Sequence, residues 1–199
     1  MSTNIHAEQK PLIYQIGKHV KLVDDATFCK SIIADGKELI TGEEYGAIRV
    51  LELKDEKVYI TFKEDLTSLA NAFSGCSALK SIPENLFTNN SAVTSFAYTF
   101  AECRSLTSIP ENLFANNPEV TNFFGTFYGC SALTTIPEKL FASNPKVISL
   151  YRTFYGCKSL TSIPENLFAN NPEVTEFIGT FRNCSTLKSI PENLFANNP

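Results

Sequence analysis

Apolar residues recur along most of the chain with a period of 27 residues. Within each period an apolar-x-x-apolar step occurs twice, and in one unit it joins Val120 to Phe123 and Leu133 to Ile136. This spacing predicts two short extended segments in each unit, with their apolar side chains turned toward a common interior. The Thr-Phe and Leu-Phe pairs between them, and the Pro after the second step, predict short helical or 3₁₀ turns.

The invariant columns of the period hold Cys, Phe and an Ile-Pro pair. The Cys column consists of Cys76, Cys103, Cys130, Cys157 and Cys184, and a Phe stands three residues before each. A single unit has too little apolar surface to offset the entropy of ordering its chain, so neighbouring units must cover one another. We therefore expect an α/β repeat solenoid of right-handed coils over residues 66–199, with five units of which the last is incomplete, short parallel strands, and short helical or 3₁₀ turns.

Residues 1–65 do not share the period and form a separate, β-rich module, which we expect to cap the first coil. Arg49–Leu53 and Val58–Phe62, with four residues between them, predict a β-hairpin. Pro11–Val23 predicts a further strand. Turn signals stand at Ala34-Asp35-Gly36, Gly42 and Gly46. At the other end, Pro199 falls inside the pattern, which suggests an array that continues or was cut short.

Composition argues against several classes of function. The net charge of −4 and the pI near 5.3 give no reason to expect nucleic acid or an anionic membrane as partner. No apolar run is long enough for a transmembrane segment. Both histidines, His6 and His19, precede the periodic region, and neither Asp nor His follows Asp65. No catalytic or nucleotide-binding motif occurs, so we expect neither an enzyme nor a cofactor.

Three of the columns invite a chemical interpretation. The cysteines lack C-x-x-C spacing and nearby histidines, so we expect buried free thiols rather than a zinc site or disulfides. The column Glu84, Glu111, Glu138, Glu165 and Glu192 is explained by exposed first-turn positions after Pro, with a calcium ladder as the alternative. The pairs Asn116-Asn117, Asn170-Asn171 and Asn197-Asn198 predict a side-chain amide ladder that satisfies turn backbones, with one Asn of each pair left-handed.

The signature F-x-x-C-x-x-L-x-x-I-P, present as FYGCSALTTIP and FYGCKSLTSIP, resembles the BspA-like leucine-rich repeats of bacterial and some protist surface proteins. The resemblance covers residues 66–199 and implies a leucine-rich-repeat solenoid, adhesion, and binding to host or matrix proteins. The unit of 27 residues and the recurrent PENLFANNPEV segment depart from the common pattern. A cell-surface or secreted location is implied, but residues 1–10 lack the order of a secretory signal, so a cytoplasmic location stays open.

Three columns vary between units, and we take variation as freedom from packing. They hold Ala70, Ala97, Phe124, Tyr151 and Ile178; Asn71, Tyr98, Gly125, Arg152 and Gly179; and Ser74, Ala101, Tyr128, Tyr155 and Arg182. Tyr and Arg are enriched in interface hot spots. We therefore expect a ligand-binding patch on the third and fourth units, formed by Tyr98, Phe124, Tyr128, Tyr151, Arg152, Tyr155 and Arg182. The alternative is that Phe124 and Tyr151 pack onto their own coil.

The leading hypothesis is a non-catalytic scaffold for protein–protein interaction or cell adhesion. The main alternative is carbohydrate recognition, in which Tyr98, Tyr128, Tyr151 and Tyr155 stack on sugar rings. The third possibility is a structural spacer within a longer surface protein.

Overall fold

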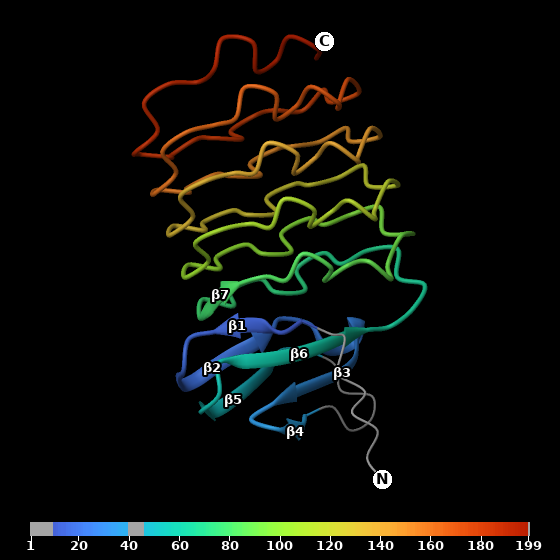
Figure 1. Ribbon diagram of the computed structural model, residues 1–199, viewed down its shortest axis with the longest axis vertical. Helices are drawn as coiled ribbons and strands as arrows, with labels where there is room; N and C mark the ends of the chain where they lie inside the picture. Colours follow the sequence, from blue (N-terminus) through green and yellow to red (C-terminus); the bar gives the residue numbers. More distant parts are fainter. Residues whose placement is uncertain (1–9, 40–45, 199) are drawn as a thin grey trace.

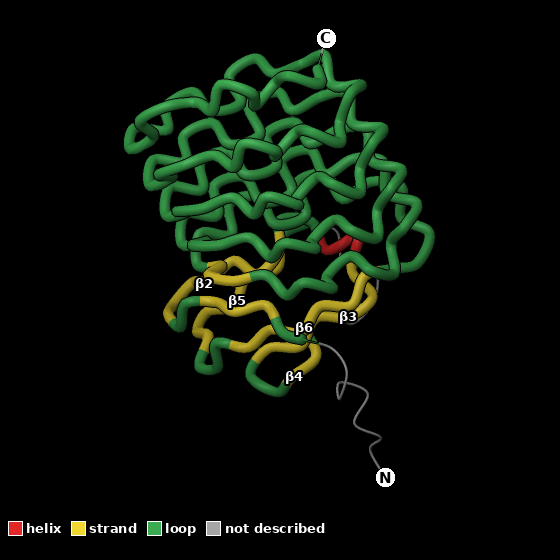
Figure 2. Tube along the Cα trace, turned by 45° about the horizontal axis from the view of Figure 1, so that its top comes forward, coloured by secondary structure: helices red, strands yellow, loops and turns green. Residues whose placement is uncertain are grey.

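The structure, a computed structural model, describes residues 10–39 and 46–198. Gly42, one of the expected turn residues, lies outside this part. The strands gather at one end of an elongated molecule, and residues 66–198 form successive layers of turns beyond them (Figure 1). Figure 2 shows that nearly all of the regular secondary structure belongs to the first 62 residues.

Two antiparallel sheets make up the N-terminal module. The first has the strand order β4-β3-β6-β1-β7, and the second pairs β2 with β5. The elements are β1 (Leu12–Tyr14), β2 (Gly17–Val23), the 3₁₀ turn η1 (Ala26–Phe28), β3 (Cys29–Ala34), β4 (Lys37–Glu38), β5 (Ile48–Leu53), β6 (Lys57–Phe62) and β7 (Leu79–Ser81). Alternate residues Val58, Ile60 and Phe62 of β6 are buried, as the period of a strand requires.

The expected hairpin between Arg49–Leu53 and Val58–Phe62 is wrong, although both segments are strands. β5 pairs with β2, whereas β6 pairs with β3 and β1. The connection between them does not close a hairpin, and the Asp35 carboxylate accepts hydrogen bonds from its backbone N–H groups at Lys54 and Asp55, at 3.0 and 2.6 Å. A distant side chain thus holds the connection and lets the two strands enter different sheets.

Pro11–Val23 is extended, but it forms two strands rather than one. β1 and β2 lie in different sheets, and the exposed residues Gln15 and Ile16 separate them. The turn expected at Ala34-Asp35-Gly36 is confirmed: Ala34 pairs with Lys37 across it. Asp35 and Gly36 adopt φ values of 50° and 69°, which suit a two-residue hairpin loop.

Residues 66–198 follow the 27-residue period as layers of turns, which we number as units 1 to 5 (66–92, 93–119, 120–146, 147–173 and 174–198). Backbone N–H groups of one layer donate to carbonyls of the next, as from Phe73 to Thr99 at 2.8 Å and from Phe100 to Thr126 at 2.9 Å. Isolated parallel bridges join Ser68, Ser95, Asn122, Ser149 and Glu176 in sequence. Equivalent residues of neighbouring units therefore lie side by side.

The expected fold class, an α/β leucine-rich-repeat solenoid with short strands and helical turns, is wrong. The described residues contain no α-helix, and the only regular strands lie in the two antiparallel sheets. The Pro-Glu-Asn-Leu-Phe segments are held by isolated turn bonds, such as Leu113 N–H to Pro110 O at 3.3 Å and Ala115 N–H to Asn112 O at 3.1 Å, and are too short to propagate a helix. Left-handed residues such as Asn71 and Gly75 interrupt the other segments, so each unit keeps one bridge instead of a parallel strand.

Columns of identical side chains fill the interior of the layers. Phe73, Phe100, Phe127, Phe154 and Phe181 stack with ring centroids 5.3 to 5.7 Å apart and nearly parallel planes. The second column contains Phe87, Phe114, Phe141, Phe168 and Phe195, with spacings of 5.9 to 6.4 Å. Offset stacking of this kind adds to the stabilisation from apolar burial.

Buried polar side chains tie the layers together. Asn144 Nδ2 donates to Phe114 O at 3.1 Å and to Asn117 O at 2.8 Å, and Asn117 and Asn171 repeat this pattern. The expected amide ladder is therefore confirmed, and Asn144 belongs to it although it follows Ser rather than Asn. The expected left-handed Asn is wrong for these pairs, because the left-handed Asn residues of the described chain are Asn71 and Asn183.

The N-terminal strands lie directly against unit 1. β1 pairs with β7, which belongs to that unit, and the Asp24 N–H donates to Ala72 O at 2.8 Å. The Phe62 ring contacts Phe73 and Phe87 with centroids 6.1 and 5.7 Å away. Phe62 thus covers the first ring of both Phe columns.

Candidate binding surface

The seven residues expected to bind a ligand come from one half of units 2 to 5. All are half-buried except Arg182, which is exposed. Six of them form one chain of contacts that crosses three units. We call the seven residues, Tyr98, Phe124, Tyr128, Tyr151, Arg152, Tyr155 and Arg182, the Tyr–Arg surface.

Ring contacts connect the aromatic members of this surface. Tyr98 lies 4.7 Å from Phe124 and 6.3 Å from Tyr128, measured between centroids. Phe124 meets Tyr151 edge-on at 4.8 Å, and Tyr128 stacks on Tyr155 at 4.9 Å with only 2° between the planes. Phe124 and Tyr151 therefore pack across units and not only onto their own layer.

Arg152 joins the two rows of rings. Its guanidinium carbon lies 5.0 Å from the Tyr151 centroid and 5.6 Å from the Tyr155 centroid, within the range of cation–π attraction. A Cβ on Gly179 would lie 3.3 Å from Arg152 Cγ and 3.9 Å from both Arg182 Cβ and Tyr155 Cδ2. Arg182 therefore adjoins the same cluster at its C-terminal edge.

The column that contains Tyr98 and Arg152 has a left-handed backbone in every unit, which was not predicted from the sequence. Asn71, Tyr98, Gly125, Arg152 and Gly179 all have positive φ, between 53° and 69°. A Cβ on Gly125 would come within 2.5 Å of Tyr98 Cε1, because the Tyr98 ring lies over that glycine. Packing between units thus explains why a large side chain is followed by glycine in this column. Variation in the column does not by itself indicate a ligand.

Beside the Tyr–Arg surface lies a hollow of about 400 Å³ that was not predicted from the sequence. Its floor is formed by Gly129 and Gly156, which have φ values of 70° and 72°. A Cβ on Gly156 would meet only backbone atoms of Gly129, at 3.7 and 3.9 Å, so the missing side chain leaves the space open there. Over Gly129, by contrast, lies the Glu102 carboxylate, whose Oε1 is 2.6 Å from the place that a Cβ would take. We call this hollow the glycine-floored groove.

The walls of the groove differ in chemistry. Tyr128 and Tyr155 form one wall, and Arg104, Ser131 and Lys158 form the other. Glu102 and Asn183 close the ends: Glu102 holds Arg104 with an Oε2–Nε distance of 2.9 Å, and Asn183 Nδ2 donates to the Tyr155 hydroxyl at 2.7 Å. The Tyr-Gly-Cys steps of the recurrent signature mark this groove in the sequence, because Gly follows each wall tyrosine.

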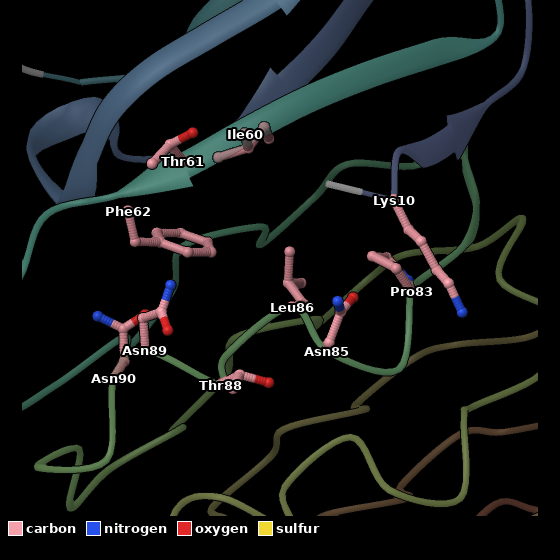
Figure 3. Close-up of a pocket in the computed structure, with 10 residues that line it drawn as sticks. All are labelled: Lys10, Ile60, Thr61, Phe62, Pro83, Asn85, Leu86, Thr88, Asn89 and Asn90. Carbon is pink, nitrogen blue, oxygen red and sulfur yellow. The ribbon is translucent and has the colours of Figure 1, made fainter. Parts of the chain in front are cut away.

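A second hollow, of about 390 Å³, lies between β6 and unit 1. Figure 3 shows the Phe62 ring and Leu86 facing it from opposite sides, with Asn85 and Asn89 near its rim and Lys10 at one end. It shares no residue with the Tyr–Arg surface. Its apolar faces belong to the contact between the N-terminal module and unit 1.

The cysteine column offers no reactive thiol. The expectation of buried free thiols is confirmed for Cys76, Cys103, Cys130, Cys157 and Cys184, and Cys29 is also free and buried. Burial raises the pKa of the Cys29 and Cys76 thiols to about 12 and that of Cys184 to about 11. Thiols that stay protonated are poor nucleophiles and poor metal ligands.

The glutamate column is exposed in every unit, and asparagine amides contact two of its members. Asn166 Nδ2 donates to Glu138 at 2.9 Å, and Asn193 Nδ2 donates to Glu165 at 3.0 Å. Residues 10–39 and 46–198 hold no cluster of three or more His, Cys, Asp or Glu side chains suited to a metal ion. Within the same ranges, no helix has the length and apolar character needed to span a membrane.

Comparisons with known proteins give little guidance. No family model matches the chain, and no curated protein matches it. Among solved structures, a chain of the Toll–Spatzle complex, described as a molecular hub in Drosophila development and innate immunity, aligns with 57% of this chain at 18% identity and a TM-score of 0.22. The aligned part spans 22% of that chain. A TM-score this low carries no argument about fold or function, and the resemblance to BspA-like repeats stays a prediction from the motif.

Proposed function

We propose that this protein is a non-catalytic binding module that contacts another protein through the Tyr–Arg surface. The observation that carries this proposal is the continuous contact of five aromatic rings and Arg152 across three adjacent units. Aromatic and arginine side chains held in place by their neighbours lose little conformational entropy when a partner binds. They are also partly exposed, so a partner can reach them.

The ring geometry favours a protein partner over a sugar. Stacking on a sugar ring needs an open aromatic face, but Tyr128 and Tyr155 cover each other face to face at 4.9 Å. Tyr98 covers Gly125, and Arg152 lies over Tyr151. Mainly ring edges, hydroxyl groups and guanidinium groups remain for contact, and these suit the mixed polar and aromatic surface of a protein interface.

The test replaces Tyr128, Tyr151 and Tyr155 with alanine together. Alanine already occupies these columns as Ala97 and Ala101 in unit 2, so the layers should form without the three rings. We expect the variant to keep its circular dichroism spectrum and to lose about 2 kcal/mol or more of binding free energy for each hot-spot ring. Pull-down of partners by wild type and variant, quantified by mass spectrometry, measures this loss.

A variant on the other half of the units serves as control, with Thr134→Ala and Thr161→Ala, both exposed residues. It should capture the same partners as the wild type. Unchanged capture by the triple tyrosine variant contradicts the proposal. Binding to a glycan array that millimolar sugar abolishes would instead favour carbohydrate recognition, and no ligand in either assay would favour a structural spacer.

A further inference from the structure

The glycine-floored groove is a built feature of units 2 to 5 and not a gap between loose side chains. Its floor needs two consecutive glycines in one column, whereas Glu102 and Asn183 hold the same column position in the units on either side. Those two side chains are fixed by contacts with Arg104 and with the Tyr155 hydroxyl. The groove is therefore closed at both ends, and its floor is open over Gly156 and covered over Gly129 by the Glu102 carboxylate.

The length of the groove fits a short extended chain. It reaches from Glu102 in unit 2 to Asn183 in unit 5. Layers joined by backbone hydrogen bonds lie about 4.8 Å apart, so three steps span roughly 14 Å. That is the length of about four residues of extended peptide at about 3.3 Å each.

The charges in the groove favour an acidic occupant. The Glu102 carboxylate over Gly129 is paired with Arg104. The ammonium group of Lys158 has no ion-pair partner in the described part of the chain. Arg152 and Arg182 lie next to Tyr155, on the other side of the tyrosine wall. This positive region stands out on a protein with a net charge of −4.

We propose that the glycine-floored groove binds an extended peptide segment of about four residues that carries an acidic side chain, whose carboxylate pairs with Lys158. The inference rests on the proposed protein-binding function and names the part of the partner that enters the groove. The wall tyrosines offer their edges to the peptide. Arg104 and Asn183 then contribute hydrogen bonds at the two ends.

The probes are two matched sets of fluorescein-labelled, capped tetrapeptides, one with Glu fixed at the second or third position and one with Gln there. Fluorescence anisotropy measures binding to the full chain. We expect the Glu set to contain peptides that bind at least about tenfold more tightly than their Gln counterparts, as for a charge-assisted hydrogen bond. Equal binding of both sets, or binding by neither, overturns the proposal.

Three variants locate the site, and each substitution copies a residue found in the same column of another unit. Lys158→Ser copies Ser131 and removes the cation, whereas Gly156→Asn copies Asn183, tolerates positive φ and fills the floor. Both should weaken the binding of Glu peptides at least about tenfold. Lys139→Asn copies Asn112 and removes a cation elsewhere, so it should leave the affinity unchanged.

The outcomes separate this inference from the proposed function. If Lys139→Asn weakens binding as much as Lys158→Ser, the attraction is non-specific and the inference fails. If Gly156→Asn keeps its fold and still binds Glu peptides like the wild type, the groove is not their site. Partner capture that the triple tyrosine variant abolishes, but that Gly156→Asn and Lys158→Ser leave intact, overturns the groove while the proposed function stands.

Discussion

Each buried asparagine of the ladder donates hydrogen bonds from its amide group to backbone carbonyls, which no other side chain of its size can do. Asn144 is fully buried, and its Nδ2 serves two carbonyls of the preceding unit at 3.1 and 2.8 Å. Substitution Asn144→Asp keeps the shape but directs carboxylate oxygens at those carbonyls. Burial and the lost donor should raise the pKa of the introduced carboxyl above its ordinary value of about 3.9.

Such a carboxyl binds its proton more tightly in the folded state than in the unfolded state. The variant should therefore lose stability as pH rises from about 4 toward 7, in the direction that proton linkage requires. We expect a loss of about 3 kcal/mol or more at pH 7, from urea midpoints measured at pH 4, 5.5 and 7. The exposed Asn116→Asp should change little, and a pH-independent loss in Asn144→Asp would refute this account.

At the scale of single residues, the sequence predicted the environment of the side chains in a column better than the backbone conformation of that column. Free buried cysteines and the amide ladder follow from residue type and spacing, because such side chains have few other stable environments in a stacked chain. The left-handed positions did not follow. Tyr98 and Arg152 occupy them although neither residue favours positive φ, and only Asn71 and the glycines of the same column indicated it.

Contacts between neighbouring layers set the limits on substitution in each turn. Substitution Gly125→Asn introduces a residue that the same column tolerates as Asn71, yet its Cβ would come within 2.5 Å of the Tyr98 ring. We expect a loss of about 1–3 kcal/mol from overpacking, measured by thermal or urea unfolding. Adding Tyr98→Gly should recover most of it, and a strictly additive double variant would show that the two positions do not interact.

Among the strands, the sequence located extended segments but not their partners. Alternation of apolar residues predicted β5 and β6 well, since one buried face is enough to specify a strand. Pairing depends on contacts between residues far apart in sequence: β5 pairs with β2, β6 pairs with β3 and β1, and the Asp35 carboxylate binds the connection between β5 and β6. Helical turns were expected because Pro, Glu and Leu suit a first turn, but segments this short form only isolated turn bonds and no α-helix.

For the molecule as a whole, we expect the contact between the N-terminal module and unit 1 to stabilise the first layer of the array. Phe62 is buried with 8% exposure and covers Phe73 and Phe87. Substitution Phe62→Ala should cost about 3–5 kcal/mol and should raise hydrogen exchange first in unit 1. Leu51→Ala, in the same module but 80% exposed, should be nearly neutral, and equal effects of the two would contradict this role.

The overall class was the least predictable feature. The period revealed which residues become neighbours, and bonds between layers 27 residues apart agree with that. It did not reveal that the units would be built from turns, with regular strands confined to two antiparallel sheets. The groove was also not predicted. It depends on one column in which units 3 and 4 have glycine, whereas units 2 and 5 have Glu102 and Asn183.

The fit of Tyr98 over Gly125, and of Arg152 beside Gly179, has a consequence for any attempt to rearrange this chain. Units with almost the same sequence look interchangeable, yet units 2 and 4 each carry a large side chain that needs the glycine of the unit that follows. Shuffling, duplicating or deleting a unit should therefore succeed only where Tyr98 and Arg152 are still each followed by a unit with glycine in that column. The order of these units is thus encoded in side-chain volume.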